Sequence, residues 1–494
     1  MQSELTYAIQ KLNSNKASGP DGVYAEMFKH GGPELEEKLL ELMNRILSEG
    51  QTPDQFHHSK VSNIPKKGSA LECKNSRPIS LLSHGYKLLA QIIYNRISES
   101  LCTFLPPNQA AYQSGRGCIE QIQHVQQIIE KCNEFKVPCF ICFVDYRKAF
   151  DTIRQDKLFE ALLLYTDIDP IYIALLINLY DVSTAQISTD VGLTRVIKIL
   201  RGTKQGDLLS ALLFCFVLAL ILQLTFEDID TGLSVGGIKH TDLEYADDAA
   251  LFIPNEEHLH NVIEKLVLHS RTFGLELNFD KTKIMIVGNT SDSRSKLNIA
   301  GHDIDVVQEF EYLGRIISNN ADDLKAVEGR INKGWQAFQN KKDLITSRQL
   351  SYKTKKDIYE TFILPVVLYS METVTWKPIL LQKLVTFQNH IMRFMTNHLL
   401  SDRVPIAQLQ QTTNLNSIDK TVKMRKLKWF GHMKRSSYPV KQVFEGLING
   451  NRGRGRPQRR WRDDIKEWLQ MDWNMINTAC RDREHWFQLC TSVI

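Results

Sequence analysis

Two adjacent aspartates, Asp247 and Asp248, stand between apolar flanks in the run 243–253. The flanks predict two β-strands, with the acidic pair in the tight turn that joins them. Placing two like charges side by side away from water is unfavourable unless a cation neutralises them, and hard oxygen ligands suit Mg²⁺. The pair therefore indicates metal-assisted phosphoryl or nucleotidyl chemistry. An exposed hairpin turn is the alternative, because aspartate is a common turn residue.

A third carboxylate, Asp145, follows the continuous apolar run 137–144. Such a run predicts a buried central strand that delivers the aspartate at its carboxyl end. Asp145, Asp247 and Asp248 would then converge on one edge of a sheet. Two metal ions held there, about 3.5–4 Å apart, could clamp the attacking and the leaving oxygen of an in-line displacement.

A glycine-bearing turn, 201–207, lies between these two predicted strands and opens a very apolar helix at Leu208. Its lysine, Lys204, the pair Gln205-Gly206 and the helix N-terminus could together cradle a nucleotide or a template base. Taken alone this signal is weak, because many helices begin after a glycine.

The order of these three pieces resembles the successive palm motifs of reverse transcriptases, in the form found in non-LTR (LINE-type, RTE-like) retrotransposons. The motifs are FVDYRKAFD at 143–151, KQGD at 204–207 and YADD at 245–248. Further segments resemble other motifs of the family in the same order: 15–22, 63–68, 76–82, 274–283 and 310–314. The last of these resembles the primer-grip hairpin. The resemblance covers roughly residues 10–320.

The resemblance implies roles for individual residues. Asp145 and Asp247 would hold two Mg²⁺ ions, with Mn²⁺ as a possible substitute, and Asp248 would support them. Lys281 would be a candidate for protonating the leaving pyrophosphate, although a solvated surface lysine is equally compatible with the sequence.

The same resemblance implies a set of substrate-binding residues. Phe150 would be the steric gate that excludes a 2′-hydroxyl, with plain core packing as the alternative. Lys66 and Arg77 would grip the incoming triphosphate or the template, and Gln205 and Gly206 would pack along the nascent base pair. Arg77 precedes a proline in an extended stretch, which suits outward display, but surface arginines are common.

The chain departs from the family pattern at several positions. Leu208 and Ala211 stand where prolines are usual, Ser76 replaces a frequent aromatic residue, and 111–117 is a loose version of the Gly-Arg fingers motif. None of these changes removes a metal ligand. They leave open a degraded relic that only binds nucleic acid. An intron-encoded maturase is a third and more distant hypothesis.

Length and composition predict an intracellular globular protein of several domains. The chain has 494 residues, 43% of them hydrophobic and 24% charged, which favours about three domains. Nine scattered cysteines without a signal peptide favour a reducing compartment, the nucleus or the cytoplasm. The uncharged run 208–226 is long enough to span a membrane, but its place after Gln205-Gly206 favours a buried palm helix.

The resemblance predicts an α+β right-hand polymerase, with fingers, a palm built on an antiparallel sheet and a helical thumb, followed by a mostly helical basic C-terminal region. The predicted boundaries are 1–125 for the fingers, 126–318 for the palm, 319–400 for the thumb and 401–494 for the C-terminal region. Apolar periodicity predicts helices over 34–47, 88–105, 322–342, 350–364 and 380–400.

The C-terminal region interleaves cations with aromatic rings. This pattern occurs at 423–432 and again in the arginine-rich segment 451–462, which is expected to be flexible. The predicted nucleic-acid-binding residues of this segment are Arg452, Arg454, Arg456, Arg459, Arg460 and Trp461. Arginines can neutralise phosphates and a tryptophan can stack on a base. A solvated charge run or a nuclear-import signal is the alternative. Asp463-Asp464 lacks strand flanks, so no metal is assigned to it.

The expected activity is RNA-directed DNA synthesis, with an RNA template, a DNA primer or target and dNTPs as partners and no membrane. An endonuclease usually precedes the polymerase in such elements, and the first motif at residue 15 leaves no room for one, so nicking is expected to come from elsewhere. The oligomeric state and the template RNA are left open.

Overall fold

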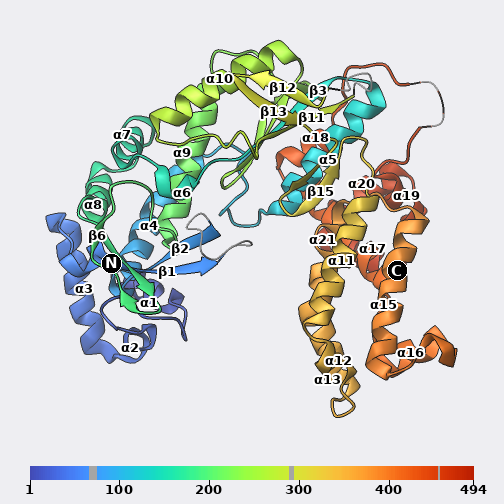
Figure 1. The fold of residues 1–494 in the computed structure, drawn as a ribbon, viewed down its shortest axis with the longest axis horizontal. Helices are drawn as coiled ribbons and strands as arrows, with labels where there is room; N and C mark the ends of the chain where they lie inside the picture. The colour runs from blue at the N-terminus through green and yellow to red at the C-terminus, as the bar shows by residue number, and fades with distance from the viewer. Residues whose placement is uncertain (66–74, 289–293, 454, 456, 494) are drawn as a thin grey trace.

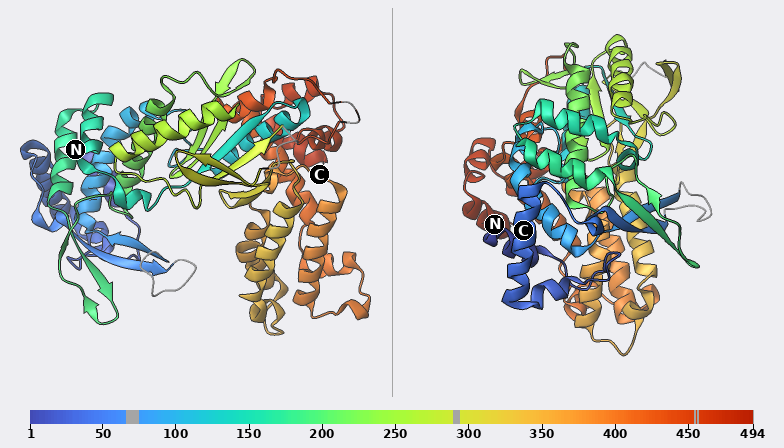
Figure 2. Two further views of the ribbon diagram at one scale, coloured as in Figure 1. Left: turned by 45° about the horizontal axis from the view of Figure 1, so that its top comes forward. Right: turned by 90° about the vertical axis from the view of Figure 1, so that its left-hand side faces the viewer.

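The computed structural model describes residues 1–65, 75–288, 294–453, 455 and 457–493. The expected α+β right-hand arrangement is confirmed. Figure 1 shows one group of helices with a small sheet at the blue N-terminal end, a central sheet, and a helical bundle in yellow and orange. The left view of Figure 2 shows the N-terminal group and the bundle extending from the same side of the central sheet.

The fingers combine helices from the N-terminal part of the chain with a sheet that also uses residues from further along it. Strand β1 pairs antiparallel with β2 and parallel with β4, so 184–198 joins this sheet although it lies beyond the predicted boundary at 125. The helices are α1 (Gln2–Lys11), α2 (Ala25–His30), α3 (Gly32–Glu49) and α4 (His84–Phe104). The strands are β1 (His58–Pro65), β2 (Ser76–Leu81), β4 (Thr184–Thr189), β5 (Gly192–Leu193) and β6 (Ile197–Lys198).

The palm sheet has six strands in the order β12-β13-β11-β3-β10-β9. Strand β3 lies inside the sheet, antiparallel to both of its neighbours, β10 and β11. The strands are β3 (Cys139–Val144), β9 (Asp242–Tyr245), β10 (Asp248–Ile253), β11 (Lys283–Val287), β12 (Lys296–Ile299) and β13 (His302–Val306). The predicted central strand and the two strands flanking the aspartate pair are therefore present.

Both faces of the palm sheet are buried, which explains why β3 is apolar at every position. Cys142 and Val144 face the core formed by α9 (Leu208–Phe226) and α10 (Glu256–Thr272). Ile141 and Phe143 point to the other face, which α5 (Cys118–Phe135) covers. Successive strand residues point to opposite faces, so a strand covered on both sides needs apolar side chains throughout.

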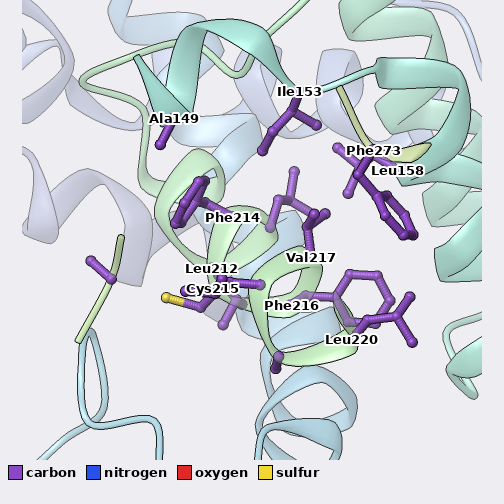
Figure 3. Packing of buried hydrophobic residues seen from close by; sticks show 14 of the residues in the cluster. Ala149, Ile153, Leu158, Leu212, Phe214, Cys215, Phe216, Val217, Leu220 and Phe273 are labelled. Carbon is purple, nitrogen blue, oxygen red and sulfur yellow. The ribbon is translucent and has the colours of Figure 1, made fainter. Parts of the chain in front are cut away.

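Helix α9 is the long apolar helix predicted for the palm. It is long and apolar enough to cross a membrane, but 78% of its apolar stretch is buried inside the protein. Figure 3 shows Phe214, Val217 and Leu220 of α9 in the same buried cluster as Ile153 and Leu158. Within the described residues α9 thus serves as the core under the sheet.

Short helices and a hairpin complete the palm. The helices are α6 (Ala149–Thr152), α7 (Gln155–Tyr165) and α8 (Pro170–Asp181), and the hairpin pairs β7 (Leu233–Val235) with β8 (Ile238–His240). A second hairpin pairs β14 (Glu309–Tyr312) with β15 (Arg315–Ser318), at the position predicted for the primer grip.

The thumb and the C-terminal region are helical and contain two hydrophobic cores, of which the thumb core also takes in Leu409 and the start of α17, Ile418 and Val422. The thumb comprises α11 (Leu324–Gln339), α12 (Lys342–Thr346), α13 (Tyr352–Ile358), a π-helical turn (Tyr359–Ile363), α14 (Leu364–Leu368) and α15 (Pro378–Thr396). After it come α16 (Ile406–Thr413), α17 (Ile418–Arg435), α18 (Pro439–Glu445), α19 (Asp463–Leu469), α20 (Trp473–Ala479) and α21 (Arg483–Val493). Helix α18 packs on α5, so the C-terminal region lies against the palm.

Candidate active site

Sheet register brings the three predicted aspartates to one edge of the palm. Val144, the last residue of β3, pairs with Ala249 of β10, so Asp145 emerges beside Asp248. Tyr245 pairs with Asp248, which leaves Ala246 and Asp247 as a two-residue hairpin turn. Ala246 adopts a left-handed backbone with φ 55°, which closes this tight turn.

The three carboxylates leave this edge with an excess of negative charge. Burial raises the pKa of Asp247, and the charge of Asp145 raises it further. Burial, followed by the charges of Asp247 and Asp145, raises the pKa of Asp248 to about 6. Lys281 offsets part of this repulsion at both aspartates. Closely spaced carboxylates that lack enough positive charge are the donor set that a hard divalent cation prefers.

The loop that follows α10 holds Asp145 in place. The Asn278 side-chain amide donates a hydrogen bond to Asp145 Oδ2 at 3.0 Å, and Lys281 Nζ lies 3.6 Å from the same oxygen. The backbone N–H of Asn278 also donates to the Asp145 carbonyl. Sequence reasoning did not single out Asn278, although it lies in the motif at 274–283; its hydrogen bonds to Asp145 become visible only once the loop is folded.

The carboxylate oxygens of the three aspartates suit a divalent metal, although they are not arranged around one common point in this structure. In the described parts of the chain no three acidic, histidine or cysteine side chains are gathered closely enough to hold one ion. Asp145 Oδ2 is occupied by Asn278 and Lys281. Lys281 is 69% exposed and can swing away, so a cation could replace its ammonium group.

Phe150 and the Gln205-Gly206 turn lie on the elements next to these aspartates. The Phe150 ring, on α6, stacks on Phe214 of α9 with centroids 4.3 Å apart and remains half-buried. Gly206 has φ 105°, and a Cβ atom there would lie 3.2 Å from the carbonyl oxygen of Ser80. The backbone N–H of Ser80 donates to the Gln205 carbonyl at 2.8 Å. Glycine is therefore required where this turn docks on β2.

Lys204, by contrast, does not point toward a nucleotide. Its ammonium group is buried, donates to the Leu179 carbonyl at 3.0 Å and lies over the rings of Tyr86 and Tyr180 at 4.7 and 5.3 Å. Burial lowers its pKa to about 8. The expectation that this lysine helps to cradle a nucleotide is therefore wrong, because the side chain packs inside the fingers–palm core.

Arg77 lies on β2 and is exposed, as predicted. Its positive charge lowers the pKa of Asp247, so it lies within electrostatic reach of the catalytic edge. Lys66 lies outside the described residues, as do Arg454 and Arg456.

Comparison with known proteins agrees with this geometry. Residues 64–317, just over half of the chain, match the family described as "Reverse transcriptase (RNA-dependent DNA polymerase)". The chain belongs to the reverse transcriptase family. The match contains the three aspartates and ends within the β14–β15 hairpin.

Relatives of this reverse transcriptase come from retrotransposable elements. It is 25% identical to the transposon TX1 149 kDa protein of Xenopus laevis over 58% of this chain and 22% of that protein. It is 26% identical to the Pol polyprotein of element R2DM of Drosophila melanogaster, over 56% of this chain and 26% of that protein. The RNA-directed DNA polymerase of mobile element jockey of Drosophila funebris is 23% identical, over 75% of this chain and 41% of that protein. The predicted non-LTR relationship is confirmed. The chain spans about a quarter of the length of TX1 and R2DM.

Among solved structures, this reverse transcriptase is similar to apo telomerase from Candida tropicalis. The identity is 13% and the TM-score 0.40, over 84% of this chain and 73% of that one. A likeness of this size adds nothing to the family assignment.

The arginine-rich segment of this reverse transcriptase contacts its own carboxylates. Arg452 pairs with Glu134 of α5, and Arg460 Nη1 lies 3.7 Å from the same carboxylate. Arg459 lies 2.6 Å from both Asp464 and Glu467. These pairs fix 459–460 against the palm and α19 instead of leaving them as an exposed flexible run.

The predicted stacking role of Trp461 is wrong. Its side chain is 1% exposed, and its indole N–H donates to the Glu372 carbonyl at 2.9 Å. The ring belongs to the core of the C-terminal region together with Phe430 and Trp486. An aromatic residue among arginines has the composition of a nucleic-acid-binding segment, but here it is the hydrophobic anchor of that segment.

The β14–β15 hairpin, the predicted primer grip, is held from two sides. Phe310 stacks on Phe143 of β3 with centroids 4.3 Å apart, which ties the hairpin to the palm. The Tyr369 hydroxyl donates to the Leu313 carbonyl at 2.7 Å, and Arg330 donates to the Gly314 carbonyl, which ties its tip to the thumb. The Arg330 guanidinium also lies 4.2 Å from the centre of the Tyr369 ring.

We predict that Tyr369→Phe weakens primer binding. Leu313 and Gly314 both have positive φ, so the tip needs its outside contacts to keep this shape. Loss of one hydrogen bond, about 1 kcal/mol, should raise the KM for primer–template about fivefold with little change in kcat. Steady-state extension kinetics would measure this, with the exposed Tyr165→Phe as control. An unchanged KM for Tyr369→Phe would remove the positioning role.

Proposed function

We propose that this chain is an RNA-directed DNA polymerase that extends a DNA 3′-hydroxyl on an RNA template, in the retrotransposition of a LINE-type element. The observation that supports this most is the convergence of Asp145, Asp247 and Asp248 from adjacent strands, within the segment that matches the reverse transcriptase family. Its partners would be an RNA template, a DNA primer or target and dNTPs, in the nucleus or the cytoplasm.

The proposed mechanism assigns the metal to the carboxylates. Asp145 and Asp247 would hold two Mg²⁺ ions, with Asp248 supporting, and Mn²⁺ could replace them. Bound there, the ions would activate the 3′-hydroxyl and stabilise the charge on the leaving pyrophosphate. Asn278 keeps the Asp145 carboxylate oriented through its 3.0 Å hydrogen bond. The protein would thus contribute mainly positioning and electrostatic stabilisation.

The surrounding residues would bind and select the nucleotide. Lys66 and Arg77 would bind the triphosphate or the template, and Lys281 would donate a proton to the leaving pyrophosphate. Gln205 and Gly206 would pack along the new base pair. The docking of the Gln205-Gly206 turn on β2 supports this role, because it places the turn against the strand that carries Arg77.

The test is Mg²⁺-dependent incorporation of dTTP on a poly(rA)/oligo(dT) primer–template. We expect incorporation that stops when EDTA removes the metal and resumes when Mg²⁺ is restored. A poly(dA) template in parallel reports the preference for RNA. If the protein binds the hybrid but never incorporates dTTP with either Mg²⁺ or Mn²⁺, the nucleic-acid-binding relic becomes the better hypothesis.

Phe150→Ala should weaken discrimination against ribonucleotides. One face of its ring packs on Phe214 and the side chain is only half-buried, so the exposed part is available to block a 2′-hydroxyl. We expect the dTTP/UTP ratio of kcat/KM to fall about 10- to 100-fold, because a removed clash changes selectivity by a few kcal/mol at most.

The matched control for Phe150→Ala is Phe150→Leu, which keeps bulk at the same position and should retain most of the discrimination. If Phe150 serves packing alone, both variants will lower thermal stability and leave the dTTP/UTP ratio unchanged.

A further inference from the structure

Positive charge is concentrated at the C-terminal end of the chain. Residues 401–494 contain 18 Lys and Arg against nine Asp and Glu, a net charge of +9, whereas the whole chain carries +5. The described arginines of 451–462 account for only part of this excess, because Arg452, Arg459 and Arg460 already pair with carboxylates. Exposed cations outside this segment are therefore a second candidate surface for a polyanion.

Helix α17 displays cations on the face opposite its buried side. Leu427, Phe430 and Met433 are buried in the C-terminal core, whereas Lys428 and Arg435 are exposed. These two lie seven residues apart, which is two helical turns, so they share one face. His432 lies between them, and burial together with the charge of Arg435 lowers its pKa.

A basic pocket lies at the C-terminal end of α17. A pocket of about 730 Å³ is lined by Lys434, Arg435, Lys441 and Arg481, with Glu445 as its one acidic residue. Lys434 pairs with Glu445, so the other three cations retain their charge toward the pocket. We call Lys428, Arg435, Lys441 and Arg481 the α17 strip.

The middle of α17 borders the segment that leads into α5. A groove of about 470 Å³ is lined by Gly115 and Gly117, just before α5, and by Lys428 and Trp429 of α17. Two further cations in this groove, Arg116 and Arg425, are neutralised by ion pairs with Glu120 and Glu372.

The groove lies beside the strand that leads into the catalytic turn. Gln121, the residue after Glu120 of the groove, donates from its side-chain amide to the carbonyl of Glu244 at 3.0 Å, and Glu244 directly precedes Tyr245 of the YADD turn. A nucleic-acid strand leaving the aspartates along this side would meet the groove first and the basic pocket afterwards.

We propose that the α17 strip binds the phosphodiester backbone of a nucleic-acid strand that continues beyond the catalytic edge. The strip has four exposed or half-exposed cations, two on α17, one on α18 and one just before α21, and the Trp429 ring lies beside Lys428. Cations that neutralise phosphates and a ring on which bases can stack bind a single strand without regard to its sequence. This inference rests on the proposed polymerase function for the direction of the strand. Backbone binding by the strip does not require catalysis.

The experiment compares two triple variants of the full chain. The strip variant carries Lys428→Gln, Arg435→Gln and Lys441→Gln. The control carries Lys420→Gln, Arg403→Gln and Lys466→Gln, which removes the same charge and the same residue types at exposed positions off the strip. Fluorescence anisotropy without dNTPs would measure binding to a blunt primer–template and to the same duplex with a long RNA or DNA overhang.

We expect the strip variant to lose about 50-fold in affinity for the overhang substrate at about 0.15 M salt. The slope of log K against log salt concentration should become shallower by about 2, because each of the three lost phosphate contacts to a single strand removes about 0.7. Binding to the blunt substrate should change little, and the control should change little on both. The RNA and DNA arms identify the strand.

Equal losses by the strip variant and the control, or equal losses on blunt and overhang substrates, would overturn the proposal. The result is independent of catalysis. A strip-dependent overhang affinity in a protein that never incorporates dTTP would keep this inference and reject the polymerase function.

Discussion

Asp247→Asn is expected to lower dTTP incorporation about 1,000-fold or more, which corresponds to about 4 kcal/mol of lost transition-state stabilisation. Asp247 occupies the hairpin turn between β9 and β10, beside Asp145 and Asp248. An amide has the size of the carboxylate but lacks its charge, so it is a poor ligand for Mg²⁺. Asp145→Asn should have an effect of the same size, because its carboxylate lies on the same edge.

Binding and stability distinguish lost chemistry from lost folding. Without metal, both variants should be at least as stable as the wild type, because each removes one of three mutually repelling charges. Affinity for primer–template should stay within about threefold, since the phosphate backbone supplies most of it. Asp167→Asn, in an exposed loop between α7 and α8, is the matched control and should retain full activity. Incorporation at the wild-type rate by Asp247→Asn would reject the assignment of the metal site.

The second large effect concerns stability. Asp464→Ala should lower the free energy of unfolding of the C-terminal region by about 3–5 kcal/mol, because it leaves a buried ammonium group without its counter-charge. Asp464 and Lys426 are both fully buried, and Lys426 Nζ lies 2.5 Å from Asp464 Oδ2. The same carboxylate accepts the backbone N–H of Trp376 at 2.7 Å and Arg459 Nε at 2.8 Å. This one side chain therefore joins α17, α19 and the segment just before α15.

Denaturant unfolding followed by tryptophan fluorescence would measure this loss, since Trp461 and Trp486 lie in the same core. Glu467→Ala is the control: its carboxylate is 61% exposed, so the change should cost less than about 1 kcal/mol. Lys426→Met combined with Asp464→Leu should cost less than Asp464→Ala alone, because no unpaired ammonium remains. A cost below about 1 kcal/mol for Asp464→Ala would show that Lys426 finds water or another partner.

Local patterns in the sequence predicted the palm well. The continuous apolar run before Asp145 became β3, and the uncharged run became α9 over Leu208–Phe226. These segments could be predicted because a strand or helix buried on every side must be apolar throughout, whatever its neighbours are. The aspartate edge followed from the same signals, since two strands of one sheet bring their acidic ends together.

The partners of charged and aromatic side chains could not be predicted in this way. Lys204 lies in a motif associated with nucleotide binding, yet its ammonium group packs between two tyrosine rings. Asn278, which holds Asp145, stands 133 residues from it in the chain. Composition reports that a side chain is charged, whereas its role depends on which distant group the fold places beside it.

The sequence by itself determined the reverse transcriptase motifs, the apolar elements of the palm and the positions of its three aspartates. Only the tertiary structure decided that Trp461 is a core residue, that Asp464 neutralises Lys426, and that exposed positive charge runs along α17. The physical reason is the distance over which each signal acts. A segment that is buried on every side must be apolar, and this can be seen in the segment itself. The pairing of two charges depends on the distance between residues far apart in the chain, which is set only when the whole chain has folded.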